Sequence, residues 1–178
     1  MFLIPGPNHT DLPGQRHPLK RRTSIRLFHD HVQKGAADSR LVLDIGAGTG
    51  APTSHLVRAG ARVVAVELHP GRAALLRQRF PDITVVEADA RSLPLPRSTF
   101  RVVANPPYGI TADLLHLLLN AGSRLRAADL VLQRAVVRKY TSQRTPRTHR
   151  MSAGLTLPRR AFRPPPRVDS AVLLVRRR

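Results

Sequence analysis

An apolar run that leads directly into a glycine-rich loop is the feature that most constrains the fold of this chain. Residues 41–45 read Leu-Val-Leu-Asp-Ile, and residues 46–50 read Gly-Ala-Gly-Thr-Gly. Such a run is typical of a strand buried on both faces of a parallel sheet. The glycines let the backbone turn sharply and approach a ligand, and residues 51–59 suit a helix. The pattern predicts an α/β fold of Rossmann-like type. Taken alone, the glycine-rich sequence is also compatible with a tight turn in an ordinary α/β protein.

Acidic residues stand at the ends of three consecutive predicted strands. Asp44 lies in the first strand, Glu67 ends the strand at residues 62–67, and Asp89 follows the strand at residues 83–87. Ligands of such sheets bind at the carboxyl ends of the strands. There Glu67 can accept hydrogen bonds from both hydroxyls of a ribose, and Asp89 can accept a hydrogen bond from an adenine amine. Asp44 can fix the loop or bind an ammonium group. Taken alone, Asp89 also reads as a loop acid or a helix cap.

The sequence Asn-Pro-Pro-Tyr follows the predicted strand at residues 100–104. Pro106 and Pro107 fix φ and remove two backbone donors, which leaves their carbonyls and the Asn105 side-chain oxygen as a rigid set of acceptors. Tyr108 adds a flat face. This arrangement suits an exocyclic amine on a planar ring, such as N6 of adenine, because acceptors on both N–H bonds localise the lone pair of the nitrogen. The simpler interpretation is a strand end with a Pro-Pro turn and a surface tyrosine.

The rest of the chain completes the alternation of strands and helices. Further helices are predicted at residues 71–80, 111–119 and 134–141, and further strands at 128–133, 152–157 and 170–175, with a basic loop at 161–167. Residues 1–20 read as an irregular arm and residues 21–34 as an amphipathic helix. We therefore expect an N-terminal arm and helix over residues 1–40 and one catalytic domain over residues 41–178.

The charge indicates a polyanionic partner. The chain has 30 Lys+Arg against 11 Asp+Glu, a formal net charge of +19, and only three of the basic residues are lysines. Arginine binds phosphate bidentately and stacks on bases, which suits RNA. Between Asp129 and Asp169 there are ten basic residues and no acid. The predicted RNA-binding residues are Arg134, Arg138, Arg144, Arg147, Arg159, Arg160, Arg163 and Arg167. With residues 176–178, this block is expected to form one docking surface beside Phe162.

Several classes of protein are not indicated. No apolar run approaches the length that crosses a bilayer, and the first residues lack the features of a signal peptide. Cysteine is absent, so disulfides and thiolate metal sites are excluded. We expect a cytoplasmic protein without a metal site.

Together these motifs resemble the ribosomal RNA adenine N6-methyltransferases, and most closely the Erm family of macrolide–lincosamide–streptogramin resistance methyltransferases. The resemblance covers residues 41–178. It rests on the glycine loop, Glu67, Asp89, Asn-Pro-Pro-Tyr, Asp-Leu-Val-Leu-Gln at residues 129–133 and Phe-Arg-Pro-Pro-Pro-Arg-Val-Asp-Ser-Ala-Val at residues 162–172. The last of these separates the family from other enzymes that carry Asn-Pro-Pro-Tyr.

The resemblance implies a class I S-adenosylmethionine-dependent methyltransferase fold, with a mostly parallel seven-stranded sheet and an antiparallel C-terminal hairpin strand. Gly46 and Gly48 would lie against the methionine end of S-adenosyl-L-methionine, Glu67 against its ribose, and Asp89 with Ala90 against its adenine. Asp44 would belong to the same cofactor site.

For the target base, the resemblance implies that Asn105 touches both the cofactor and the reacting amine. Pro106 and Pro107 belong to the same catalytic motif. Tyr108 and Phe162 would sandwich an adenine that has left its stack. The alternative for Phe162 is a core residue of the last hairpin.

The chain departs from the family pattern in two places. The segment that usually closes over the cofactor has only a degenerate counterpart at residues 14–19, so no role is assigned to His17 or Leu19. We expect no C-terminal helical domain of the kind that most members carry, since the chain resembles the short, single-domain type. RNA recognition is then expected to fall to the catalytic domain.

The expected function is transfer of a methyl group to N6 of an adenine in 23S ribosomal RNA, by a monomer that acts before the subunit is fully assembled, with antibiotic resistance as the consequence. Housekeeping methylation of 16S ribosomal RNA and methylation of DNA adenine remain alternatives. An RNA-binding relative that has lost catalysis is the alternative from another class. The sequence leaves open the particular adenine and whether one or two methyl groups are added.

Overall fold

The computed structural model describes residues 41–143, 147–162 and 164–178, with the side chain of Tyr108 left out of the description. The predicted arm and helix of residues 1–40, which include His17 and Leu19, lie outside the described residues, as do Arg144 and Arg163. In the part that is described, no helix is both long and apolar enough to cross a membrane.

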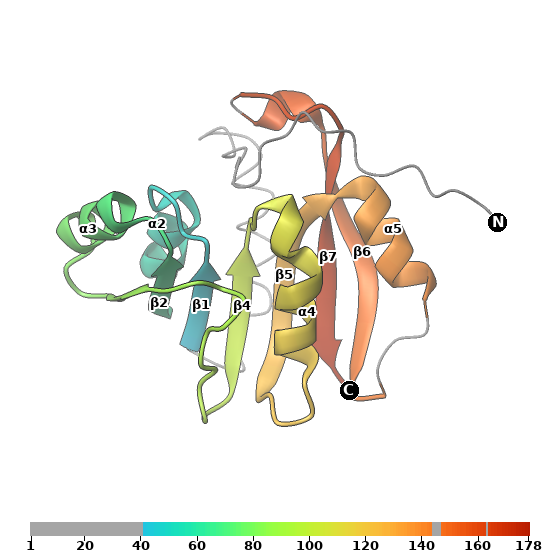
Figure 1. The fold of residues 1–178 in the computed structure, drawn as a ribbon, viewed down its shortest axis with the longest axis horizontal. Coiled ribbons are helices and arrows are strands. Elements are labelled where there is room, and N and C mark those ends of the chain that lie inside the picture. Colours follow the sequence, from blue (N-terminus) through green and yellow to red (C-terminus); the bar gives the residue numbers. More distant parts are fainter. Residues whose placement is uncertain (1–40, 144–146, 163) are drawn as a thin grey trace.

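The described residues form one seven-stranded sheet with the order β3-β2-β1-β4-β5-β7-β6 (Figure 1). The strands are β1 (Leu41–Ile45), β2 (Arg62–Glu67), β3 (Thr84–Glu87), β4 (Phe100–Ala104), β5 (Leu125–Gln133), β6 (His149–Leu157) and β7 (Ser170–Arg177). Strands β1 to β5 are parallel to one another, and β7 is antiparallel to both β5 and β6. The predicted fold, including the antiparallel C-terminal strand, is confirmed.

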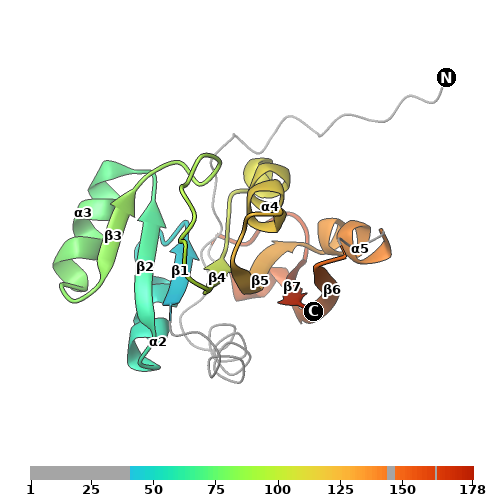
Figure 2. The same ribbon diagram turned by 90° about the horizontal axis from the view of Figure 1, so that it is seen from below.

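Helices cover both faces of this sheet (Figure 2). They are α2 (Ala51–Arg58), α3 (Pro70–Arg79), α4 (Thr111–Leu119) and α5 (Arg134–Ser142). Leu114 and Leu118 of α4 and Val137 of α5 pack into the larger apolar cluster, together with Phe100 of β4. Leu56 of α2 belongs to a second cluster on the opposite face. The central strands β1, β4 and β5 are therefore buried on both sides, which explains their continuous apolar runs.

Two strands begin three residues earlier than predicted, and one short helix was not predicted. β5 begins at Leu125 rather than residue 128, and β6 begins at His149 rather than residue 152. The predicted loop at residues 161–167 is preceded by a short 3₁₀ helix, η3 (Arg159–Ala161). The added strand residues include Arg126 and Arg150, which do not suggest a strand by composition; pairing with β4 and β7 extends these strands.

The order of the strands creates a crevice between β1 and β4. From β1 the chain proceeds outward through β2 and β3, and from β4 it proceeds in the opposite direction. Loops that follow two such strands diverge and leave room for a ligand at the carboxyl edge of the sheet. The glycine loop follows β1 and the Asn-Pro-Pro-Tyr segment follows β4, so the two main motifs meet at this point (Figure 1).

Candidate functional site

A cavity of about 320 Å³ lies at this crevice. Four chain segments enclose it, each of which follows a parallel strand at the carboxyl edge. Its lining consists of Ile45, Gly46, Val66, Leu68, Ala88, Asp89, Ala90, Arg91, Pro106, Pro107, Gly109 and Ile110. Mostly apolar walls with one carboxylate suit a planar ring that carries a donor group. Of the predicted site residues, the cavity thus brings together Gly46, Asp89, Ala90, Pro106 and Pro107.

The glycine loop is held from beneath by the end of β2. The backbone N–H groups of Gly46 and Ala47 both donate to the carbonyl of Val66, at 2.8 and 3.0 Å. Gly50 has φ of 86° and a Cβ there would lie 2.5 Å from the Phe80 ring, so only glycine fits. This packing fixes where the loop turns and where α2 begins.

Glu67 is fully buried and its carboxylate is surrounded by donors from the chain itself. It accepts hydrogen bonds from the backbone N–H of Gly48 at 2.8 Å and of His69 at 3.0 Å. The Arg72 guanidinium adds a hydrogen bond through Nε at 3.1 Å and an ion pair through Nη2 at 3.0 Å. Glu67 therefore joins the glycine loop to the start of α3. Its predicted contact with a ribose stays a prediction, and requires neighbouring atoms to move because Glu67 has no exposed surface.

Asp44 is also buried, on the same face of the sheet as Glu67. Its Oδ2 accepts a hydrogen bond from Thr53 Oγ1 at 2.5 Å. Thr53 lies in the first turn of α2, so this bond fixes the helix that follows the glycine loop. This contact joins β1 to α2, while the two predicted roles of Asp44, fixing the glycine loop or meeting an ammonium group, stay predictions.

Asp89 lines the cavity and pairs with Arg91. The Arg91 guanidinium donates to both carboxylate oxygens, through Nη2 at 2.6 Å and through Nε at 3.0 and 3.1 Å, and the Arg91 backbone N–H adds a bond at 2.9 Å. The side-chain and backbone hydrogen bonds from Arg91 lower the pKa of Asp89 to about 2. The carboxylate is therefore ionised at neutral pH and acts only as an acceptor, as recognition of an adenine amine requires.

The Asn-Pro-Pro-Tyr segment leaves the sheet at Ala104, which is buried. Pro106 is buried and Asn105 is half-buried. The carbonyl of Pro107 accepts the backbone N–H of Ile110 at 3.2 Å, which closes the short 3₁₀ helix η2 (Tyr108–Ile110). The Pro107 carbonyl, one of the two predicted proline acceptors, thus already accepts one hydrogen bond from the chain itself. Its second lone pair can still accept a hydrogen bond from a ligand.

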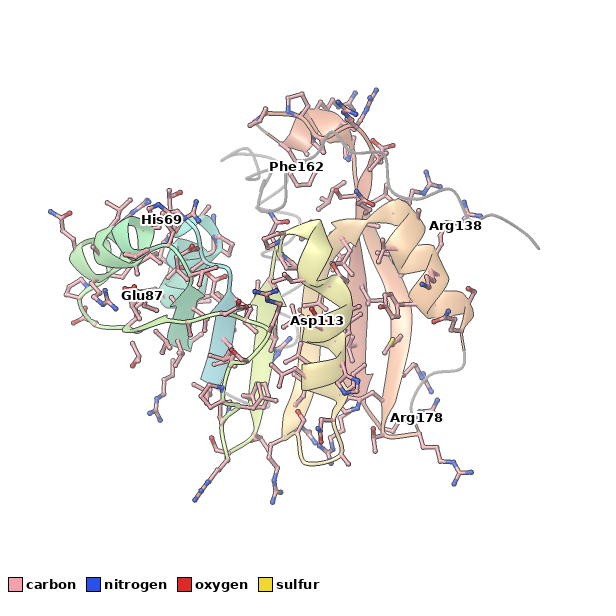
Figure 3. The ribbon with its side chains drawn as sticks, in the orientation of Figure 1. His69, Glu87, Asp113, Arg138, Phe162 and Arg178 are labelled. Atoms are coloured by element: carbon pink, nitrogen blue, oxygen red, sulfur yellow. The ribbon has the colours of Figure 1, made fainter. Side chains whose placement is uncertain are left out.

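Phe162 is buried in the second apolar cluster, in contact with the core of the last hairpin. Its ring is 1% exposed, and Figure 3 shows it directly beneath the η3 turn above β7. Phe162 also borders a second, larger cavity of about 910 Å³ between η3 and the proline-rich loop. Its position matches the alternative of a core residue, and a stacking role stays a prediction that needs the ring to be uncovered.

The second cavity is lined by basic residues and by one acid that bonds to the backbone of its wall. Arg159, Arg160 and Arg167 line it with Asp169 and Phe162. The Asp169 carboxylate accepts the backbone N–H of Arg159 at 3.0 Å, and the Arg159 guanidinium donates to the carbonyl of Arg167 at 3.2 Å. The loop is therefore ordered by its own contacts, with cationic side chains at the carboxyl edge of the sheet.

The predicted RNA-binding residues lie at more than one edge of the sheet, and their contacts with RNA stay predictions. Arg159, Arg160 and Arg167 are at the carboxyl edge, and Arg134 begins α5 at that same edge. Arg138, also on α5, projects away from the sheet in Figure 3. Arg147, however, precedes β6, which runs parallel to β5, and therefore lies at the opposite edge. Residues 176–178 end at that opposite edge too, because β7 runs antiparallel.

Three residues that the sequence did not single out hold the predicted acids. Thr53 bonds Asp44, Arg72 pairs with Glu67, and Arg91 pairs with Asp89. Arg91 follows Asp89 by two residues, a spacing that permits a local ion pair. Thr53 and Arg72 lie in the first turns of the helices that follow the two strands. Polar residues at such positions are a general signal for contacts with a strand end.

The strand order, the glycine loop after β1 and the ligand-sized cavity at the crevice together define the fold of class I S-adenosylmethionine-dependent methyltransferases. The family described as ribosomal RNA adenine dimethylase matches residues 29–178. The chain belongs to this family.

Known proteins of the family are similar over most of the chain. An "rRNA methyltransferase" of Streptomyces thermotolerans is 42% identical over 150 residues, which cover 78% of this chain and 50% of that protein. A "Ribosomal RNA small subunit methyltransferase A" of Bordetella avium is 33% identical over 163 residues, 81% of this chain and 62% of that protein. The chain thus spans between half and three-fifths of the length of these relatives. The crystal structure of 23S rRNA methyltransferase ErmE superimposes with a TM-score of 0.78 at 30% identity, over 90% of this chain and 69% of that one.

Proposed function

We propose that the chain transfers a methyl group from S-adenosyl-L-methionine to N6 of an adenine in 23S ribosomal RNA. The observation that carries the proposal is the cavity at the crevice, where Asp89 and the Pro106–Pro107 backbone line one space. Asp89 suits the adenine of a cofactor, and the Pro106–Pro107 backbone belongs to the motif that suits a reacting amine. The two ligands would therefore meet at the end of β4.

The residues present fit the cofactor. The cavity offers apolar walls from Ile45, Val66 and Ile110 for a purine ring and an ionised carboxylate, Asp89, for its amine. The glycine loop lies beside it, with Gly46 on the cavity wall. When bound, S-adenosylmethionine supplies an electrophilic methyl group on its sulfonium. Gly46 and Gly48 would lie against its methionine end and Glu67 against its ribose. Asp89 and Ala90 would lie against its adenine.

The chain contributes position and acceptors. The Asn105 side-chain oxygen and the proline carbonyls would accept hydrogen bonds from the two N–H groups of the target amine. These bonds would localise the lone pair of the nitrogen and direct it toward the methyl group. Acceptors aimed at a positive charge that develops on the nitrogen stabilise the transition state, and holding the reacting groups in line removes much of the entropic cost. No strong general base is needed, since the methylated amine is acidic and water can take its proton.

The target adenine must leave its stack before it reaches this site. Extrusion costs a few kcal/mol and is least unfavourable for a loop or single-stranded base. Stacking on an aromatic ring contributes about 1–3 kcal/mol per contact, and Tyr108 is the first candidate for this role. Phe162 would add to it only after its ring is uncovered.

The 23S target is supported by the likeness to ErmE, whose structure is that of a 23S rRNA methyltransferase. A small-subunit target is the rival, favoured by relatives such as the Bordetella avium protein, whose name states that subunit. Both involve the same chemistry. The wider proposal includes residues 41–178 as the catalytic unit, a monomer in the cytoplasm, action on RNA that is not fully assembled, and macrolide–lincosamide–streptogramin resistance as the result.

Primer extension on ribosomal RNA from cells with and without the gene tests the proposal. A gene-dependent stop or pause at one adenine of 23S RNA is expected, with no change in 16S RNA. A change confined to 16S RNA would favour the housekeeping alternative. Absence of any change, combined with retained RNA binding by the purified chain, would favour the relative that has lost catalysis. Cells that carry an Asn105→Ala variant serve as the control for expression of the protein without transfer.

A further inference from the structure

A second arginine surface lies at the amino edge of the sheet, on the side opposite the cofactor crevice. We call it the amino-edge arginine surface. It consists of Arg124, Arg126, Arg147, Arg150, Arg177 and Arg178, all of which are exposed. It occupies the starts of β5 and β6 and the end of β7, three neighbouring strands. Figure 3 shows Arg178 extending from this edge, far from the η3 turn and Phe162.

Backbone contacts hold this surface in one place. The N–H of Arg178 donates to the carbonyl of Thr148 at 3.0 Å, and Arg177 is the register partner of His149. The Arg177 guanidinium donates to the carbonyl of Ser123 at 3.2 Å. The loops before β5 and β6 are therefore tied to the last residues of β7. The arginines project from an ordered part of the fold.

No residue of β5, β6, β7 or their connections that the structure describes places an acid at this surface. Across β5, β6, β7 and their connections, the described residues include two acids, Asp129 and Asp169. Asp169 lies at the carboxyl edge, where it bonds Arg159. Asp129 is buried inside the sheet and pairs with Arg176 at 2.6 Å and with Arg101 at 3.7 Å. Neither carboxylate offsets the charge of the exposed arginines at the amino edge.

The arrangement concentrates like charges. Arg150 stands directly opposite Arg176 in the antiparallel pair of β6 and β7, and the Asp129 carboxylate that pairs with Arg176 is buried inside the sheet. Arginine rather than lysine supplies every cation, and its guanidinium matches the geometry of phosphate. A polyanion would be attracted by the summed charge of the six exposed arginines at this edge.

The surface suits a double helix better than a single strand. Proteins that hold single strands stack the bases on aromatic side chains, and no aromatic side chain of the described residues is exposed at this edge. Double-stranded RNA is recognised by shape and through its backbone. Exposed arginines without a stacking platform therefore match the phosphates of a duplex.

Distance separates this contact from the target site. β6 has nine residues and runs from one edge of the sheet to the other, which at about 3.3 Å per residue spans about 26 Å. RNA held at the amino edge is thus a different segment from the loop that presents an adenine at the crevice. We propose that the amino-edge arginine surface binds the phosphate backbone of a second, double-helical segment of the same RNA. The inference rests on the proposed function, because it takes RNA as the substrate.

Two RNAs and two variants test the inference. One RNA is a short hairpin with the target loop, and the other is the longer domain of 23S RNA with helices on both sides of that loop. The variant Arg124→Gln/Arg150→Gln removes two charges from the surface, and Arg58→Gln/Arg77→Gln removes two exposed charges from α2 and α3 as the matched control. Binding is measured across a series of salt concentrations, and melting temperature verifies that all variants are folded.

For the longer RNA, the surface variant is expected to bind on the order of tenfold more weakly at physiological salt, with a salt slope reduced by roughly 1.4–1.8 for two lost phosphate contacts. Binding and methylation of the hairpin should match the parent. An unchanged slope on the longer RNA, an equal loss on both RNAs, or the same loss in the control variant would each overturn the inference. Methylation of the hairpin by the parent tests the proposed function separately, since it does not involve the surface.

Discussion

The backbone N–H of Gly48 donates a 2.8 Å hydrogen bond to Oε2 of Glu67, and so joins the glycine loop after β1 to the end of β2. The residue that the family resemblance assigns to a cofactor ribose is therefore also a structural support for the loop beside the cofactor cavity. Any substitution of Glu67 should change both the stability of the loop and the affinity for the cofactor. The two effects can be measured separately.

We predict that Glu67→Ala lowers both the free energy of unfolding and the affinity for the cofactor. Loss of the carboxylate leaves the N–H groups of Gly48 and His69 without this buried acceptor, at a cost of about 1–3 kcal/mol in the free energy of unfolding. Urea unfolding measures that cost, and calorimetry with S-adenosylmethionine measures the affinity. Arg72→Gln is the control, since it removes one partner and keeps the carboxylate. Unchanged cofactor affinity in a folded Glu67→Ala protein would refute the ribose assignment.

The pairing of Asp89 with Arg91 predicts a distinct pH dependence. Hydrogen bonds from Arg91 lower the pKa of Asp89 to about 2 in the folded protein, from 3.8. A lowered pKa means that the ionised form stabilises the fold above about pH 4, and that this contribution disappears as the pH falls toward 2. Titration of Asp89 should therefore not change cofactor affinity between pH 5 and 8. An NMR titration of the Asp89 carboxyl carbon should show the low pKa, and Arg91→Gln should return it toward 3.8.

The fold was predictable because its buried parallel strands are encoded as apolar runs. β1 and β4 are covered by helices on both faces, and almost all of their residues are buried and apolar. The start of β5 was missed, because Arg126 and the alanines after it are weak strand formers that are held by pairing with β4 and β7. Such pairing depends on residues far away in the sequence.

The site was predictable in position and less so in its contacts. Asp44, Glu67 and Asp89 all lie where parallel strands end, and this follows from the alternation of strands and helices alone. Their partners depend on side-chain geometry that no motif specifies. The positions of the basic residues could not be predicted for a different reason: the sequence places Phe162 near residues 176–178, yet β7 carries the chain through eight residues to the opposite edge.

Asp129 should be important for stability rather than for catalysis. It is 1% exposed and lies between Arg101 and Arg176, on three adjacent strands. Removal of one partner from a buried ion pair costs about 3–5 kcal/mol, so Asp129→Asn should lower the free energy of unfolding by that amount. Urea unfolding measures the loss. The double variant Asp129→Asn/Arg101→Met should recover part of it, because it also removes the most buried cation. Equal stabilities of parent and Asp129→Asn would contradict the importance of the ion pair.

Asn105 should separate folding from transfer. It is half-buried at the end of β4, beside Pro106 on the cavity wall. Asn105→Ala is expected to fold with a melting temperature near that of the parent and to bind S-adenosylmethionine more weakly. Methyl transfer to RNA should be lost almost completely, because the amide oxygen that aims the target amine is gone. Transfer is measured with labelled cofactor at saturating concentration, which removes the effect of affinity. Transfer at the parent rate under these conditions would exclude Asn105 from the reaction.

Tyr108 tests whether the target adenine is held by stacking. It follows the two prolines at the start of η2, and the next residues of that segment, Gly109 and Ile110, line the cavity. If the ring face binds the base, Tyr108→Phe should keep most of the activity and Tyr108→Ala should lose most of it. Loss of one stacking contact corresponds to about 1–3 kcal/mol, or roughly fivefold to 150-fold in kcat/KM for RNA. Single-turnover transfer to the hairpin RNA measures both variants, and cofactor affinity measured in parallel should be similar in the two proteins. An equal loss in Tyr108→Phe and Tyr108→Ala would show that the hydroxyl, and not the ring face, makes the important contact.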